Sequence, residues 1–281
     1  MNIGIGLPIG DPPALLDWAR RAEAGPFSTL GLLDRLVYDN PEPLVALAVL
    51  AGATSRVRVQ TEVLLAKLRE PALLAKQAAT LDRMTGGRLV LGLGVGGRAD
   101  DHQVTGVDLR TRGKRLDGQP AVLRRLWAGE PYGDGAGPIG PSPARPGGPT
   151  LLFGGFQPAA LRRVARWGDG FLAAAPPSWA GGLFDTVRDF WREYDREGEP
   201  RLVAQINVAL GPDAVLDDAR ARMHAYYAFT GMPDRMVAGL LTTPTAVRSA
   251  IHAFTDLGAD EVICYCYGLD PAQADRLADI L

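Results

Sequence analysis

The chain has 281 residues, of which 47% are hydrophobic, and its formal net charge is −2. This length suits one α/β barrel of ~250 residues, and the hydrophobic content excludes a disordered chain. The small negative charge excludes the concentrated basic surface of nucleic-acid-binding proteins, so we expect no nucleic-acid partner.

Short apolar segments alternate with segments of helical periodicity from the N-terminus onward. In the first half, this pattern predicts strands over residues 3–7, 29–33, 57–65 and 88–94. It predicts a helix that begins at residues 11–13, with Asp11 as its N-cap, and further helices over 43–54, 71–84 and 112–128. Gly86 and Gly87 are typical of a helix end and stop the helix over 71–84.

The second half continues the same alternation. Strands are predicted over residues 150–153, 171–174, 202–210 and 261–265. Helices are predicted over 158–167, 179–197, 213–229, 245–257 and 271–281. Two helices follow the strand at 202–210, so the connection after the seventh strand is enlarged.

Eight strands that are each followed by a helix predict a closed parallel (β/α)8 TIM barrel, with residues 1–281 as a single domain. A doubly wound open sheet is the alternative fold. The regular count and the absence of a second zone of different composition favour the barrel.

Residues 130–149 interrupt the rhythm with the sequence EPYGDGAGPIGPSPARPGGP. No helix or central strand tolerates so much glycine and proline. The segment is either a surface insert or a lid over the mouth of the barrel, because long loops in compact domains often carry function.

The N-terminal sequence MNIGIGLPIGDPP has no basic segment and only a short apolar run, unlike a signal peptide. No apolar stretch reaches the ~18 residues that a membrane span needs. Cys264 and Cys266 share one face of a strand and lack the spacing of metal or redox motifs, so we expect reduced packing residues. These features predict a cytoplasmic protein without a membrane partner.

The active site of a (β/α)8 barrel lies at the carboxyl ends of its strands. Asp34 and Arg35 follow one of these strand ends, and Glu62 lies near another. Because Glu62 alternates with the valines of its strand, a valine face turned toward the helices would point Glu62 into the barrel mouth. A carboxylate there is costly unless it is paired, so the alternative is a structural ion pair with Arg58 or Arg98.

Two glycine-rich turns also follow predicted strands, and glycines let backbone N–H groups approach an anion closely. The turn LGLGVGGR matches a dinucleotide-binding pattern, but it follows the fourth strand and precedes a polar loop rather than a helix, so we reject that reading. Gly154 and Gly155 are placed to open the helix over 158–167, whose N-terminus would attract an anion. The two turns together could hold one phosphorylated cofactor.

Three histidines occur, and they show no metal-binding spacing, so no metal is expected. His224 and His252 lie in predicted helices. His102 follows the fourth strand and is the only histidine near the predicted mouth, which makes it a candidate for a direct role.

Four blocks of the chain resemble the luciferase-like monooxygenase family. They are REPALLAKQAATLDRMTGGRLVLGLGVGG at 69–97, RGKRLDGQPAVLRRLWAG at 112–129, LLFGGFQPAALRRVARWGDGFL at 151–172 and TTPTAVRSAIHAFTDLGADEVI at 242–263. Gaps in the resemblance fall at residues 130–149 and 211–241. The family implies a barrel that binds reduced FMN or the deazaflavin F420 at the strand ends.

Carried over to this chain, the resemblance implies a role for each matching residue. Glu62 and Asp34 are candidate catalytic residues by this resemblance, and His102 joins them because of its place near the mouth. The candidate cofactor-binding residues flank the flavin ring or reach its ribityl chain and phosphate, and they are Thr61, Val63, Gly94, Val95, Gly96, Gly97, Gly154 and Gly155. The chain departs from many F420-dependent members, which have Asp-His where this chain has Asp34-Arg35.

The expected function is a flavin-dependent monooxygenase that uses O2 and reduced FMN, supplied by a separate flavin reductase, on a small organic substrate. The alternatives are an F420-dependent oxidoreductase that transfers a hydride, and a flavin-free accessory or binding protein. A homodimer is expected from the family, with residues 41–53 as an interface helix or a buried barrel helix. A valine at Gly155 is expected to weaken flavin binding and leave the fold intact.

Overall fold

Eight parallel strands close into a barrel in the computed structural model, which describes residues 1–10 and 12–281. The strand order follows the sequence, and the last strand pairs with the first, so that Ile5 lies opposite Cys264. The strands are β1 (Asn2–Gly6), β2 (Thr29–Leu32), β3 (Arg58–Thr61), β4 (Leu89–Leu93), β5 (Thr150–Gly154), β6 (Gly170–Ala173), β7 (Arg201–Val208) and β8 (Glu261–Cys266). The predicted (β/α)8 barrel is confirmed. The doubly wound alternative is wrong, because an open sheet has two edge strands, whereas here β1 pairs with β8 and closes the sheet.

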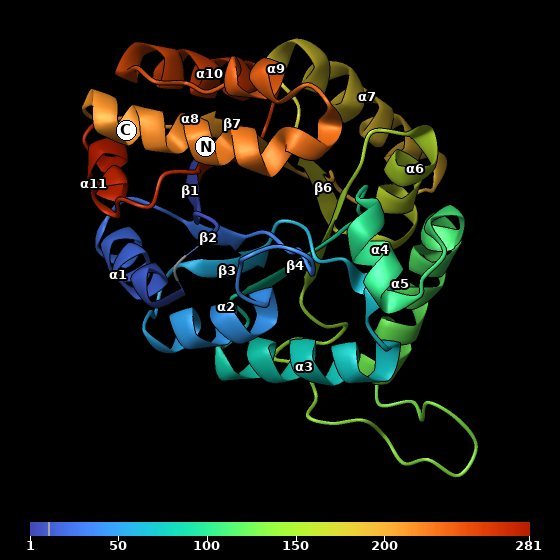
Figure 1. The fold of residues 1–281 in the computed structure, drawn as a ribbon. Helices are drawn as coiled ribbons and strands as arrows, with labels where there is room; N and C mark the ends of the chain where they lie inside the picture. The colour runs from blue at the N-terminus through green and yellow to red at the C-terminus, as the bar shows by residue number, and fades with distance from the viewer. Residues whose placement is uncertain (11) are drawn as a thin grey trace.

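The helices surround this barrel (Figure 1). The α-helices are α1 (Leu15–Ala24), α2 (Pro43–Gly52), α3 (Pro71–Met84), α4 (Ala99–Thr105), α5 (Arg112–Trp127), α6 (Pro158–Trp167), α7 (Pro177–Glu193), α8 (Asp213–Tyr227), α9 (Pro233–Val237), α10 (Pro244–Asp256) and α11 (Ala272–Ala278). Short 3₁₀ turns are η1 (Pro12–Ala14), η2 (Ala66–Leu68), η3 (Leu109–Thr111) and η4 (Ala228–Thr230). None of these described helices is long and apolar enough to cross a membrane. The predicted N-cap Asp11 lies outside the described residues.

Several helices begin where the sequence places a proline after a capping side chain. Glu42 accepts from the Val45 N–H at 2.8 Å before α2, and Glu70 accepts from the Leu73 N–H at 2.9 Å before α3. Proline in the first turn costs no hydrogen bond, and the cap satisfies one of the free N–H groups. These local signals explain why the predicted helix starts agree with the structure within a few residues.

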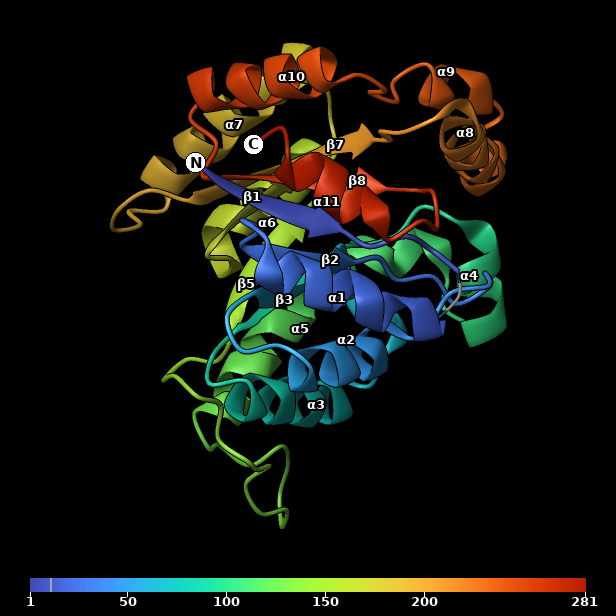
Figure 2. The same cartoon turned by 90° about the vertical axis from the view of Figure 1, so that its left-hand side faces the viewer.

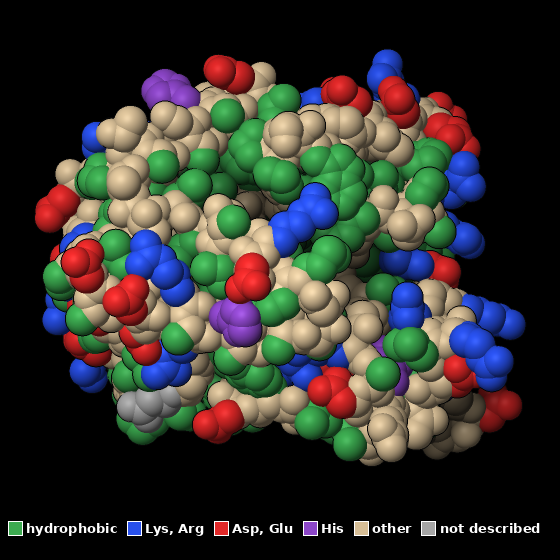
Figure 3. Space-filling model, turned by 45° about the horizontal axis from the view of Figure 1, so that its top comes forward, with side chains coloured by type: hydrophobic (Ala, Val, Ile, Leu, Met, Phe, Trp, Pro, Cys, Tyr) green, Lys and Arg blue, Asp and Glu red, His purple; other side chains and the backbone are tan. Residues whose placement is uncertain are grey.

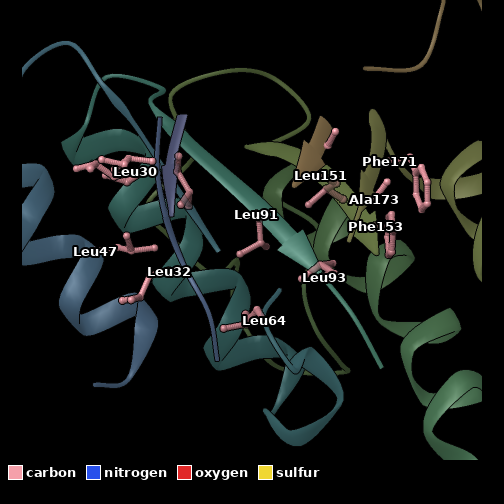
Figure 4. Packing of buried hydrophobic residues seen from close by; sticks show 14 of the residues in the cluster. Leu30, Leu32, Leu47, Leu64, Leu91, Leu93, Leu151, Phe153, Phe171 and Ala173 are labelled. Atoms are coloured by element: carbon pink, nitrogen blue, oxygen red, sulfur yellow. The ribbon is translucent and has the colours of Figure 1, made fainter. Parts of the chain in front are cut away.

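Buried side chains form two layers that follow the alternation along each strand. The outer layer packs the strands against the helices, as Leu32 of β2 and Leu47 of α2 illustrate (Figure 4). The inner layer fills the barrel and includes Val90, Leu152 and Ile263. Cys264 and Cys266 are free and buried together in the outer layer, which confirms their predicted packing role.

Two short helices were not predicted. The segment after the β4 glycines, predicted as a polar loop, contains α4, whose C-cap Gly106 adopts the left-handed conformation at φ 66°. The helix α9 lies in the connection after β7, which is enlarged as predicted and carries α8, η4, α9 and α10. Both helices are too short for periodicity to reveal them.

The Gly/Pro-rich segment 130–149 lies away from the mouth. It joins the end of α5 to the start of β5, and it protrudes beyond α3, whereas the strand arrowheads in Figure 2 point toward α4 and α8. Its contacts include the Ala144 N–H, which donates to Asp82 at 2.9 Å, and Gly140, whose carbonyl accepts from Lys76 at 2.7 Å. The lid alternative is therefore wrong, because an αβ connection of this fold lies at the amino ends of the strands.

Candidate functional site

A cavity of about 740 Å³ opens at the carboxyl ends of β3 to β6. Its size falls in the usual range for small-molecule and cofactor sites. Its lining is largely apolar or glycine, and it combines strand ends with η3 and the first turns of α5 and α6. The lining residues are Glu62, Val63, Gly94, Val95, Gly96, Gly97, Leu109, Arg110, Arg112, Gly113, Gly154, Gly155, Phe156, Gln157, Ala159, Ala160, Arg163, Leu172, Ala174 and Gln205.

Both predicted glycine turns line this cavity. A Cβ at Gly94 would lie 2.3 Å from a methyl group of Val63, so only glycine fits there. Gly155 has φ +152°, and a Cβ there would lie 2.5 Å from the Ala160 Cβ. The helix α6 begins at Pro158, as predicted, and Gly154 and Gly155 lie in the turn between β5 and this helix.

Three arginines line the helical side of the cavity. Arg163 of α6 is buried and pairs with Asp117 at 2.6 Å, and Arg110 of η3 pairs with Asp108 at 3.3 Å. Arg112 begins α5 and forms no salt bridge with another described residue. The prediction did not include these arginines, although the sequence RGKR at 112–115 was a visible signal.

Glu62 lines the cavity from the end of β3, as the alternation along its strand predicted. The Gln60 side-chain N–H donates to Glu62 Oε1, and Glu62 Oε2 is buried without a hydrogen-bond partner among the described residues. Burial raises the pKa of Glu62 to about 8, although the Gln60 hydrogen bond opposes this rise. A carboxyl in this state is neutral at pH 7 and able to give up a proton.

The alternative role of Glu62 as a structural ion-pair partner is wrong. Arg58 lies at the start of β3 and pairs with the buried Glu261 at 3.3 Å. Arg98 stacks 4.4 Å from the ring centroid of Tyr226 and 3.7 Å from that of Phe229. Each arginine is thus committed to another partner.

Asp34 and Arg35 do not line the cavity, contrary to the expectation for Asp34. Asp34 pairs with Arg69 at 2.6 Å and accepts from the Leu65 N–H at 2.8 Å. Arg35 pairs with the buried Asp101 at 2.7 Å, which connects the end of β2 to α4. The two charges therefore hold loops together at the mouth rather than facing a ligand.

His102 lies on α4 at the carboxyl ends of the strands, near the mouth as expected, but it does not line the cavity. It is buried on α4, and a ring nitrogen lies 2.7 Å from the Lys67 Nζ. Burial is the largest cause that lowers the pKa of Lys67, to about 8, and it also lowers the pKa of His102. The pair lies outside the cavity lining, so a direct catalytic role for His102 finds no support in the geometry.

The remaining predicted contacts divide into two groups. Val63 and Val95 line the cavity, as expected. Thr61 does not, because it is fully buried and its hydroxyl donates to the Gly92 carbonyl at 2.7 Å. Gln205 of β7 also lines the cavity but was not predicted. In the sequence, a polar residue of an alternating strand looks the same whether it faces a cavity or solvent.

Tyrosines from α8 and β8 fill the other part of the mouth. The hydroxyl groups of Tyr227 and Tyr267 lie 3.0 Å apart, and the Tyr265 hydroxyl accepts from the Leu33 N–H at 3.1 Å. Tyr226 packs edge-on against Tyr227, with ring centroids 4.9 Å apart. This packing explains why the cavity lies toward β3 to β6 rather than over the barrel axis.

Charge elsewhere on the molecule is mixed. On the face shown in Figure 3, Lys and Arg side chains are interspersed with Asp and Glu. Over residues 1–10 and 12–281, no group of three or more His, Cys, Asp or Glu side chains could hold a metal ion.

The family model described as luciferase-like monooxygenase matches residues 4–254. An uncharacterized protein of Mycobacterium tuberculosis is 30% identical over 69% of this chain and 70% of its own length. An F420-dependent glucose-6-phosphate dehydrogenase of Kineococcus radiotolerans is 25% identical over 93% of this chain and 89% of its own length. Among solved structures, monooxygenase RslO1 from Streptomyces bottropensis has a TM-score of 0.78 at 20% identity, covering 100% of this chain and 97% of RslO1, a likeness that shows the fold alone.

Proposed function

Since this chain belongs to the luciferase-like monooxygenase family, we propose that its cavity binds a phosphorylated flavin and that the protein is a flavin-dependent oxidoreductase. The observation that carries this proposal is that polar groups lie at two separate parts of the cavity lining, with apolar side chains between them. Glycine turns and arginines line its helical side, and Glu62 and Gln205 line it from the strands. Apolar side chains such as Val63 and Leu172 lie between these polar groups.

The residues present fit a flavin with a phosphate group. Arg112 offers a guanidinium without a salt-bridge partner among the described residues, and guanidinium groups bind phosphate through two parallel hydrogen bonds. Gly97 leaves open space where a side chain would otherwise extend, and Ala159 belongs to the first turn of α6, where N–H groups attract anions. Val63, Val95 and Leu172 would contact the apolar ring.

When bound, the reduced flavin supplies the electrons for the reaction, and the protein supplies binding, orientation and exclusion of water. Glu62 is the residue placed to move a proton, because its carboxyl is neutral near pH 7 and its Oε2 has no partner within the described chain. Gln205 would orient a substrate by hydrogen bonding from β7. The arginines would hold the cofactor rather than take part in the chemistry.

The first candidate reaction is oxygenation of a small organic substrate with O2 and reduced FMN, which a separate flavin reductase would supply. It is supported by the family match and by the absence of the Asp-His pair at positions 34 and 35. The second candidate is hydride transfer with F420, and the relative from Kineococcus radiotolerans supports it.

Binding under anaerobic conditions separates these candidates. The purified protein would be titrated with photoreduced FMN and, separately, with reduced F420, and the heat of binding would be recorded. Tight binding of reduced FMN supports the monooxygenase, whereas tight binding of F420 alone assigns the second reaction. Binding of neither flavin would overturn the proposal and leave a flavin-free accessory protein.

A further inference from the structure

Two neighbouring residues shape the position of the Glu62 carboxyl. Gln60 lies two residues earlier in the chain, and its side-chain N–H donates to Glu62 Oε1. Gly31 of β2 leaves the space that the carboxyl fills, because a Cβ there would lie 2.7 Å from Glu62 Cγ and 2.9 Å from Oε1. Any side chain at position 31 would therefore push the carboxyl from its place.

Two polar atoms of this arrangement remain without partners. Gln60 is fully buried, yet its Oε1 accepts no hydrogen bond from the described residues, and the same is true of Glu62 Oε2. Buried polar atoms without a partner are rare in native proteins and often mark a place where water or a ligand binds. Glu62 lines the cavity, so a ligand bound there would contact the side chain that carries the free, buried carboxyl oxygen.

The surrounding charges leave Glu62 without a close cation. Glu261 of β8 raises the pKa of Glu62 and Arg201 of β7 lowers it, both less than burial does. Arg201 itself pairs with Glu261. Tyr265 of β8 also faces Glu62, whose charge contributes to raising the pKa of that tyrosine. The Gln60 amide is therefore the one hydrogen bond that orients Glu62 among the described residues.

We propose that Gln60 and Gly31 are positioning residues that fix one carboxyl oxygen of Glu62, so that the other oxygen gives a proton to an oxygen atom of the substrate. The inference rests on the proposed function of the cavity. In this step the Glu62 O–H bond breaks and a substrate O–H bond forms as the carbonyl π pair moves to oxygen and the carbonyl carbon takes a hydride from the reduced flavin of the proposed function. The resulting Glu62 carboxylate regains its proton from solvent. The substrate class that fits is an uncharged molecule with an oxygen acceptor such as a carbonyl group. A substrate carboxylate would find no cation beside Glu62, since the lining arginines belong to η3, α5 and α6.

Infrared spectroscopy of the cofactor-free protein tests this proposal. The difference spectrum between wild type and Glu62→Gln isolates the C=O band of the neutral Glu62 carboxyl, which is then titrated with pH. Gln60→Met keeps the side-chain length but removes the amide whose hydrogen bond lowers the pKa of Glu62. We expect a tenfold smaller acid dissociation constant of Glu62, equal to ~1.4 kcal/mol, and therefore a higher titration midpoint.

Gly31→Ala is the second variant, because it displaces the carboxyl without changing either polar side chain. We expect it to shift the midpoint, because the displaced carboxyl loses its burial and its Gln60 hydrogen bond together. Gln119→Met is the matched control, since Gln119 is a buried glutamine of α5 that hydrogen-bonds to the Ala66 carbonyl at 2.8 Å, and it should leave the midpoint unchanged.

An unchanged midpoint in Gln60→Met, or in Gly31→Ala if the first variant does not fold, overturns the positioning role. The absence of a neutral-carboxyl band at pH 7 in the wild type overturns it as well. Because these spectra are recorded without cofactor, a failure of flavin binding would sink the proposed function and leave the titration result standing. The two failures are therefore distinguishable.

Discussion

Gly97 is the cavity-lining position at which a larger side chain tests flavin binding with the least effect on the fold. A Cβ there has no heavy atom within 4 Å, and Gly97 does not have a positive φ. A valine would occupy open space beside the other glycines of the turn and keep the phosphate from the backbone N–H groups. Hydrogen bonds to charged groups contribute ~1.5–3 kcal/mol, so losing one predicts at least about tenfold weaker binding.

The assay for Gly97→Val is anaerobic calorimetric titration with the reduced flavin that the wild type binds, together with a thermal melt. The melting temperature should stay within about 2 °C, because exposed substitutions of this kind change stability by no more than ~0.5 kcal/mol. Gly118→Val is the control, since a Cβ at this exposed α5 position also meets no atom within 4 Å and lies outside the cavity lining. A folded Gly97→Val protein that binds flavin within twofold of wild type would refute the assignment of this turn.

Gly155 does not permit the same test, although the sequence suggested that a valine there would leave the fold intact. Its φ of +152° is strained for any residue with a side chain, and the new Cβ would lie 2.5 Å from the Ala160 Cβ. We therefore expect Gly155→Val to lose stability together with flavin affinity, so its effect on binding would not be specific.

Three further predictions follow from individual contacts. Glu62→Gln should leave flavin affinity within a few-fold of wild type and reduce turnover. Its free energy of unfolding in urea, relative to that of wild type, should rise between about pH 5 and pH 8. This sign follows because burial raises the pKa of Glu62 to about 8 in the folded state, so the wild type loses stability as pH rises through that window; an equal difference at both pH values would argue against it. Arg35→Leu should lower the free energy of unfolding in urea by about 3–5 kcal/mol, because it leaves the buried carboxylate of Asp101 without its cationic partner. A loss below about 1 kcal/mol would show that solvent reaches this pair. Val45 and Val49 are exposed on α2, and we expect them to face a second copy of the chain. Val49→Asp should therefore convert a homodimer to a monomer in sedimentation velocity. A wild-type protein that sediments as a monomer at micromolar concentration would contradict this interface.

Much of the site could be predicted because its positions depend on strand ends. Glu62 and the glycines at 94–97 lie at or near the ends of predicted strands and directly follow β3 and β4, and the carboxyl ends of barrel strands share one face. The alternation of valines with Glu62 predicted that Glu62 points into the mouth, but the same alternation would turn Val63 toward the helices, and Val63 also lines the cavity. Residues placed by helix ends, such as Arg112, were missed because no periodicity indicates which helix terminus reaches the mouth.

The titratable residues predicted near the mouth that the structure places outside the cavity lining have charged partners that are distant in sequence. Asp34 pairs with Arg69, 35 residues away, and Arg35 pairs with Asp101, 66 residues away. His102 meets Lys67 across a separation of 35 residues. A strand-end charge therefore looks the same in the sequence whether it faces a ligand or another loop.

The barrel is predictable from the sequence alone, because the alternation of apolar strand segments with helical segments is local and repeats around eight strands. The sequence also determined the end of the barrel at which the site lies. Only the tertiary structure decided that Glu62 keeps a free carboxyl oxygen while Asp34 and His102 are satisfied by protein partners. The physical reason is that burial and pairing of a charge depend on which loops meet at the mouth, and the loops meet only when the barrel closes.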